Sequence, residues 1–144
     1  LVSVEILRNH DQITTWSVGH KTQLRPLIQK IGLEHLWVER QWDKQLLNLP
    51  DAYNGHIPIS AILAAAGVVV AILSGKQDVV VSNEQSANEA TLHYQGVAIN
   101  HQYSKSQEFE TSFQNILIHY FGDSVRYYSF LRQALSDSAE AQAI

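Results

Sequence analysis

The fold of this chain is decided by residues 78–84, which read DVVVSNE. Three consecutive valines are typical of a strand that is buried on both faces in a parallel sheet. Ser82, Asn83 and Glu84 then follow the carboxyl end of that strand, where open α/β sheets place their ligand crevice. A buried polar group without a partner costs about 1–3 kcal/mol, so polar residues packed this densely indicate a binding site rather than core.

A second polar segment, residues 100–106, reads NHQYSKS and precedes Glu108 and Glu110 on an expected helix. His101 and Lys105 would lie one turn apart if that helix begins early, where they could act as a base and as a cation beside a nucleotide. The alternative is a surface histidine near a solvated lysine, because histidine titrates near neutrality at any exposed position. Glu108 most commonly forms a surface pair with Lys105 at this spacing.

The composition excludes several classes of protein. The chain has 144 residues, 45% of them hydrophobic, which is enough for one compact domain with a sizeable core. A net charge of -4 without a basic block argues against a nucleic-acid partner, and the absence of cysteine removes disulfides and thiolate chemistry. The longest apolar run, residues 57–73, includes Pro58 and Gly67 and is at the lower limit for a membrane span, so we expect a buried core helix. We therefore expect a soluble cytoplasmic protein without a membrane partner.

Apolar periodicity gives the order of the elements. Helices are expected over residues 1–8, 23–31, 58–74 and 104–121, the last with Ser104 as its N-cap, and a short Ala-rich helix is expected in the tail. Strands are expected over residues 13–18, 36–40 and 78–81. This alternation predicts an α/β fold of three layers in one domain, with a mainly parallel sheet flanked by helices. We expect Trp16, Trp37 and Trp42 to be core residues.

Three blocks that occur in order resemble the bacterial UDP-N-acetylmuramoyl-L-alanyl-L-glutamate epimerase family. They are residues 54–58 (NGHIP), 81–87 (VSNEQSA) and 97–106 (VAINHQYSKS). The resemblance implies the adenine nucleotide alpha-hydrolase-like fold of PP-loop ATP pyrophosphatases. In that family a phosphate loop would precede the first helix. Because the chain opens on Leu1 and contains no methionine, we expect an excerpt that lacks the N-terminal strand and the phosphate loop.

The resemblance also implies a reaction in peptidoglycan precursor synthesis. ATP, with Mg²⁺ bridging its phosphates, would adenylate the α-carboxylate of the terminal L-glutamate of UDP-MurNAc-L-Ala-L-Glu. The acyl-adenylate would make the adjacent Cα–H more acidic, so that one group removes the proton and another returns it on the opposite face. Hydrolysis would release the D-glutamyl product and AMP. The chain would thus be part of an isomerase that takes a UDP-muramyl dipeptide.

Carried onto this sequence, the resemblance implies two sets of site residues. The catalytic candidates are Glu84, His101, Tyr103 and Lys105, with Glu84 also able to bind magnesium or orient the substrate. The candidates for binding substrate or nucleotide are Asn54, Gly55, His56, Ser82, Asn83, Asn100, Gln102, Ser104 and Ser106.

Each of these assignments has a simpler alternative. Asparagines favour turns, and Glu84 suits a loop or a helix N-terminus. Residues 54–56 could form an anion site at the start of the apolar helix, or equally a plain turn with an N-cap.

Two other functions stay open. Another PP-loop ATP pyrophosphatase could adenylate a substrate for amidation or thiolation, although thiolating enzymes often use a cysteine and none is present. A nucleotide-binding module without catalysis is the other alternative. Catalytic zinc is disfavoured, because the seven histidines include no His-x-x-x-His or His-x-x-Glu-His spacing.

Overall fold

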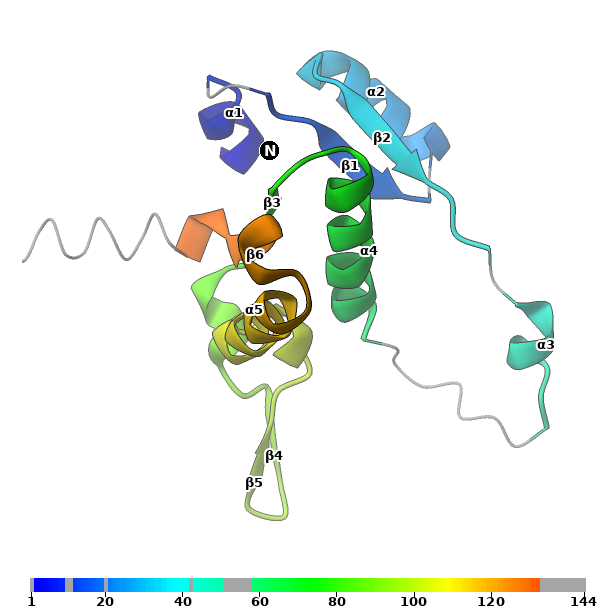
Figure 1. The fold of residues 1–144 in the computed structure, drawn as a ribbon. Coiled ribbons are helices and arrows are strands. Elements are labelled where there is room, and N and C mark those ends of the chain that lie inside the picture. Colours follow the sequence, from blue (N-terminus) through cyan, green and yellow to red (C-terminus); the bar gives the residue numbers. More distant parts are fainter. Residues whose placement is uncertain (1, 10–11, 20, 42, 51–57, 133–144) are drawn as a thin grey trace, which may run out of the picture. The chain divides into compact units, whose positions relative to one another are not determined.

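The computed structural model describes the whole chain except residues 1, 10–11, 20, 42, 51–57 and 133–144 (Figure 1). The chain divides into two compact units, Leu1–Ile57 and Pro58–Ile144. Asn54, Gly55 and His56 lie outside the described residues, as do Trp42 and the expected helix of the tail. The anion site at residues 54–56 therefore stays a prediction.

The first unit is built around a parallel pair of strands. Its elements in chain order are α1 (Val2–Leu7), β1 (Thr15–Val18), α2 (Lys21–Ile31), β2 (His35–Val38) and the short α3 (Lys44–Leu47). β1 pairs with β2 in parallel, with Thr15 opposite His35 and Val18 opposite Val38. The connection between them runs through α2, as parallel neighbours require.

His35 on β2 joins the two strands through its ring. Its Nδ1 lies 2.8 Å from Thr15 Oγ1 and its Nε2 lies 3.0 Å from Ser17 Oγ, both on β1. The ring also meets Trp37 edge to face, with 4.5 Å between the centroids. Burial lowers the pKa of His35 from its ordinary value of 6.5, because the charged form loses its hydration. The folded unit therefore favours the neutral imidazole.

We expect the first unit to lose stability as the pH falls below 6.5. Below that pH the unfolded chain binds a proton at His35, whereas the folded chain binds it only at a lower pH. The free energy of unfolding therefore decreases as the pH falls toward the folded pKa. An NMR titration of the His35 ring should give a midpoint below 6.5. His35→Gln should flatten the dependence of stability on pH directly below pH 6.5. A midpoint above the ordinary value would contradict this assignment.

The second unit holds a parallel pair and a hairpin. Its helices are α4 (Ile59–Leu73) and α5 (Gln107–Phe121), with 3₁₀ turns η1 (Gln85–Asn88), η2 (Tyr103–Lys105) and η3 (Gly122–Ser124). Its strands are β3 (Asp78–Val81), β4 (Leu92–Tyr94), β5 (Val97–Ile99) and β6 (Arg126–Ser129). β3 pairs with β6 in parallel, and β4 pairs with β5 as an antiparallel hairpin that projects away from α5 (Figure 1).

A glycine ends α4 and turns the chain into β3. Gly75 has a φ of +64°, a left-handed conformation that suits glycine. Its N–H donates to the carbonyl of Ile72 at 3.2 Å, and the next N–H, of Lys76, donates to the carbonyl of Ala71 at 2.8 Å. This pair of bonds is a Schellman motif, which ends the helix four residues before β3 begins.

The core of the second unit packs the two long helices against β3 and β6. Alternate strand residues share one face, and Val79 and Tyr127 lie opposite each other on that face. Both belong to a buried cluster with residues of α4, α5 and the position just before β6: Ala64, Val68, Ala71, Leu117 and Val125. The Phe113 ring of α5 stacks on Phe109 and meets Tyr127 edge to face. These contacts fix α5 against β6.

The predicted strands occur where the sequence placed them, with small shifts of their ends. Residues 78–81 form β3 as predicted, whereas β1 begins two residues later than expected and β2 ends two residues earlier. Parallel pairing with helical connections confirms a mixed α/β chain. Within the described residues the strands form three two-stranded sheets, so the three-layer arrangement around one larger sheet stays a prediction.

The long apolar helix contributes to the core, as expected, but it is buried on one side only. The stripe Ala64, Gly67, Val68 and Ala71 is buried at helical spacing. Large side chains elsewhere on α4 are exposed, among them Ile62, Val69, Ile72 and Leu73. Across the described part of the chain, no helix combines the length and the hydrophobicity that a membrane crossing requires.

Two neighbouring residues of α5 test the position of this core. Leu117 is 3% exposed and Ile116 is 51% exposed. Leu117→Ala should lower the free energy of unfolding by about 2–5 kcal/mol, because it removes buried methyl groups and leaves a cavity. Ile116→Ala should change it by less than about 0.5 kcal/mol. If urea unfolding gives the same loss in the free energy of unfolding for both variants, the described orientation of α5 is contradicted.

Candidate functional site

The 82–84 segment follows directly on β3, as the sequence predicts. Asn83 is half-buried, while Ser82 and Glu84 are exposed. Glu84 precedes η1, and its carboxylate accepts a long hydrogen bond of 3.4 Å from Ser86 Oγ. The carboxylate thus remains accessible to solvent at the carboxyl end of a parallel strand.

The side chain of Asn100 holds the 100–106 segment against η1. Its Nδ2 donates to the carbonyl of Ala87 at 2.8 Å, and its Oδ1 accepts from the N–H of Gln102 at 2.7 Å. The second bond closes an Asx turn, one of the ordinary uses of asparagine. The His101 N–H donates to Thr91 Oγ1 at 3.2 Å, which anchors the same turn to the hairpin. Asn100 therefore has a structural part in bringing the two polar segments together.

The helix that follows this segment begins later than the sequence indicated. Tyr103–Lys105 forms the 3₁₀ turn η2, and α5 starts at Gln107. Ser106, 4% exposed, is its N-cap, because its Oγ accepts from the Phe109 N–H at 3.1 Å. The prediction of Ser104 as N-cap is wrong. His101 and Lys105 consequently do not share a turn of an α-helix, since His101 lies in the turn before η2.

Two serines distinguish the observed cap from the expected one. Ser106→Ala removes the acceptor of the Phe109 N–H, so it should lower the free energy of unfolding by about 0.5–2 kcal/mol. Ser104→Ala leaves that bond in place and should change it by less than about 0.5 kcal/mol. Thermal or urea unfolding of both variants measures the two changes in the free energy of unfolding. A larger loss for Ser104→Ala would show that the helix starts where the sequence first suggested.

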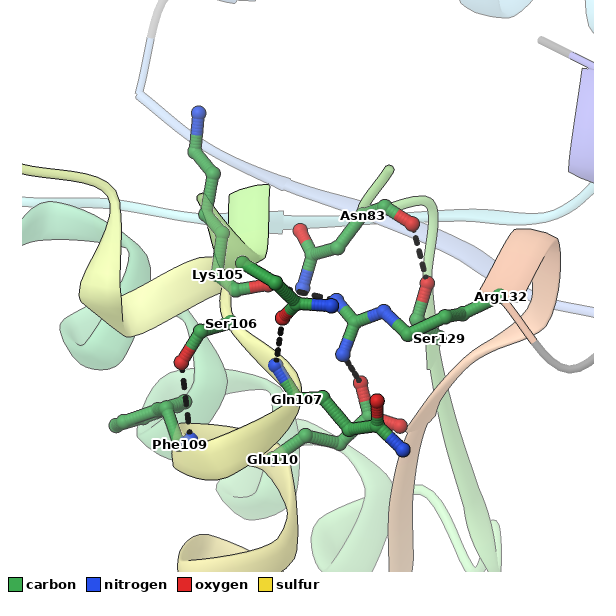
Figure 2. A network of polar contacts seen from close by, with 9 residues as sticks. Asn83, Lys105, Ser106, Gln107, Phe109, Glu110, Ser129 and Arg132 are labelled. Carbon is green, nitrogen blue, oxygen red and sulfur yellow. Dashed lines mark hydrogen bonds and ion pairs between the residues drawn. The ribbon is translucent and has the colours of Figure 1, made fainter. Parts of the chain in front are cut away.

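A buried arginine connects the elements around the two segments (Figure 2). Arg132 Nη1 pairs with Glu110 Oε2 on α5 at 3.1 Å, and Nη2 donates to the carbonyl oxygen of Lys105 at 2.6 Å. Close by, Ser129 Oγ donates to the carbonyl oxygen of Asn83 at 2.8 Å. The ends of β3, β6 and η2 and the first turns of α5 are thereby tied together. The Lys105 side chain points away from this network (Figure 2).

Tyr127 adds a buried phenol to the same region. Burial raises its pKa, and a hydrogen bond with the Asn83 side chain opposes that shift only in part. The phenol therefore keeps its proton at neutral pH and fixes the Asn83 side chain. The sequence did not single out Tyr127, Ser129 or Arg132, because they stand in a tail without a periodic pattern. Their partners lie far away along the chain.

An open groove of about 960 Å³ lies between the base of the hairpin and the first turns of α5. Tyr103 and Glu108 line it, and the Tyr103 hydroxyl donates to Glu108 Oε1 at 3.4 Å. The expected pair of Glu108 with Lys105 is not among the ion pairs of the described residues. The other lining residues include Asn88, Asn100, Ser106, Gln107, Thr111 and Ser112. The groove thus combines hydroxyl, amide and carboxylate groups with an apolar part formed by Ala90, Ala98 and Ile99.

The structure places most of the predicted site residues in one region of the second unit. Ser82, Asn83 and Glu84 end β3, and the 100–106 segment, with His101, Gln102, Tyr103, Ser104 and Lys105, packs beside η1 through η2. Within the described ranges, no three His, Asp or Glu side chains gather in a way that could hold a metal ion. Any magnesium here would rest on one or two carboxylates together with phosphate oxygens, a donor set that Glu84 fits.

Parallel strand pairs joined through helices define the class of the molecule, a mixed α/β protein. The family described as the MurL N-terminal domain matches residues 1–130. The chain belongs to this family.

Curated relatives extend this similarity. A UDP-N-acetyl-alpha-D-muramoyl-L-alanyl-L-glutamate epimerase of Xanthomonas oryzae pv. oryzae is 38% identical over 99% of this chain and 32% of its own length. Proteins of the same name from Salinispora tropica and a Micromonospora species are 37% and 36% identical, each over 92% of this chain and 30% of their own length. The chain thus spans about a third of the length of these relatives. No solved structure gives a significant match.

Proposed function

We propose that this chain forms part of an epimerase that inverts the terminal L-glutamate of UDP-MurNAc-L-Ala-L-Glu. The observation that carries the proposal is the 100–106 segment, whose imidazole, phenol and ammonium groups extend from one short turn in a member of the MurL N-terminal domain family. The relatives bear the name of this activity. Peptidoglycan precursor synthesis is the corresponding role.

Inversion at the glutamyl Cα needs groups that remove a proton on one face and return one on the other. His101, Tyr103 and Lys105 are all exposed, so substrate can reach them. The imidazole of His101 can accept a proton, and the ammonium of Lys105 can donate one or stabilise negative charge. Tyr103 is already joined to Glu108 through its hydroxyl, which orients the phenol toward the groove.

We further propose that the reaction uses ATP and Mg²⁺. ATP would convert the α-carboxylate into an acyl-adenylate, which makes the Cα–H more acidic. Glu84 is the candidate magnesium ligand, because it presents an exposed carboxylate at the end of β3, and one or two carboxylates suffice beside phosphate oxygens. Asn83 and Ser82, on the same strand end, would bind the substrate or the nucleotide.

The experiment is a proton-exchange assay in D₂O on the protein expressed at its natural full length. With UDP-MurNAc-L-Ala-L-Glu and ATP, it should form AMP and pyrophosphate and place deuterium at the glutamyl Cα. His101→Ala and Lys105→Ala should each lower the exchange rate by at least about 10²-fold, as expected when a general acid or base is lost. His93→Ala is the matched control, because His93 is an exposed histidine on the hairpin strand β4. The His93→Ala variant should keep the deuterium exchange rate of the unmodified protein.

Three outcomes would contradict the proposal. ATP cleavage with transfer of ammonia or sulfur, and no deuterium at Cα, would favour an amidating or thiolating relative. Nucleotide binding without turnover would favour a binding module. Equal losses in the His93 and His101 variants would remove the reason for placing proton transfer in the 100–106 segment.

A further inference from the structure

Arg132 is a buried cation that no part of the proposed reaction uses. It is 8% exposed, and Glu110, its partner from the first turn of α5, is largely buried as well. A buried charge needs a paired and hydrogen-bonded setting, because it has lost its hydration. Glu110 supplies the opposite charge through Nη1, and the backbone of η2 supplies a second acceptor through Nη2. Arg132 Nε has no partner among the described residues.

The second bond acts directly on the candidate catalytic turn. Nη2 donates to the carbonyl oxygen of Lys105 at 2.6 Å, a charge-assisted bond to the last residue of η2. One residue further on, Ser106 caps α5. Within the turn, the Lys105 N–H donates to Gln102 and the Ser106 N–H donates to Tyr103. The backbone at Lys105 is thus held by Arg132, three residues after the end of β6, and by the start of α5.

We propose that Arg132 is a positioning residue for the turn that carries Tyr103 and Lys105. By binding the Lys105 carbonyl while paired with Glu110, it fixes the direction in which both side chains leave the backbone. Its kinetic consequence rests on the proposed function, whereas its effect on the backbone does not. The Lys105 ammonium points away from the pair, so Arg132 acts on it only through the main chain (Figure 2).

The planar guanidinium explains why the residue is an arginine. Its two terminal nitrogens reach two acceptors in different elements at once, Glu110 on α5 and Lys105 on η2. Lysine has a single nitrogen on a flexible stem and cannot reproduce this fork. Arg132→Lys therefore keeps the charge while it weakens one of the two connections, which makes it a milder test than truncation.

The test uses Arg132→Lys in the protein at its natural full length, with two readouts. The kcat for deuterium incorporation at the glutamyl Cα should fall about 10- to 100-fold, as expected for a displaced catalytic group, while KM changes less than threefold. Hydrogen exchange of the Lys105 and Ser106 amides should become about tenfold faster, because local opening of η2 is easier. Both amides are hydrogen-bonded within the turn and report on it directly.

Arg126→Lys is the matched control. Arg126 is the first residue of β6 and forms a two-bond ion pair with Asp78, but this pair is exposed and lies at the opposite end of β6 from Arg132. It should leave kcat and the exchange of both amides unchanged. Identical results for the two variants would overturn the proposal, as would a general loss of stability in Arg132→Lys without a specific change at Lys105 and Ser106.

The two proposals can fail separately. If the unmodified protein shows no exchange at the glutamyl Cα, the proposed function fails, and amide exchange alone decides the role of Arg132. If Arg132→Lys does not fold, Glu110→Gln takes its place, since it keeps an acceptor for Nη1 but removes the charge that orients the guanidinium. Unchanged exchange at Lys105 and Ser106 in that variant would overturn the positioning role.

Discussion

The parallel pairing of β3 with β6 is the constraint on which the arrangement of the second unit depends. It sets Val81 opposite Ser129, so that Asn83 meets Ser129 and Arg132 follows at the same end of the pair. The Tyr127 ring lies on the face that β3 and β6 share, and it packs edge to face against Phe113 of α5. Hydrophobic packing thereby decides which polar groups become neighbours at the carboxyl ends of the strands, and the polar contacts then fix their positions.

The two polar segments become one region because ordinary structural bonds join them. Asn100 binds the carbonyl of Ala87, the side chain of Asn88 accepts from the Gln107 N–H, and Arg132 binds the carbonyl of Lys105. These side chains hydrogen-bond to backbone groups, so the exposed side chains nearby remain available for chemistry. In sites that need precise geometry, buried groups commonly hold the backbone in position while exposed groups react.

The sequence predicted the elements with strong local signals. The valines of β3 and their polar end were found in full, and β1, β2, α4 and α5 were placed to within a few residues. The hairpin was missed, because its strands are only three residues long and do not alternate, although Gly96 suits the positive φ that it and Gln95 adopt in the tight turn. β6 reads RYYS and gains its strand structure from pairing with β3, and Arg132 finds its partners across long separations. Tertiary contacts of this kind leave no local periodicity to read.

The most direct measurement is a crystal structure of the protein at its natural full length with UDP-MurNAc-L-Ala-L-Glu bound. We expect the terminal glutamate to lie against the 100–106 segment, with His101 or Lys105 within hydrogen-bonding reach of the groups around its Cα. We also expect Arg132 to hold the Lys105 carbonyl as it does here. A glutamate bound away from this segment, with His101 and Lys105 facing solvent, would contradict the central claim that proton transfer occurs at the 100–106 segment.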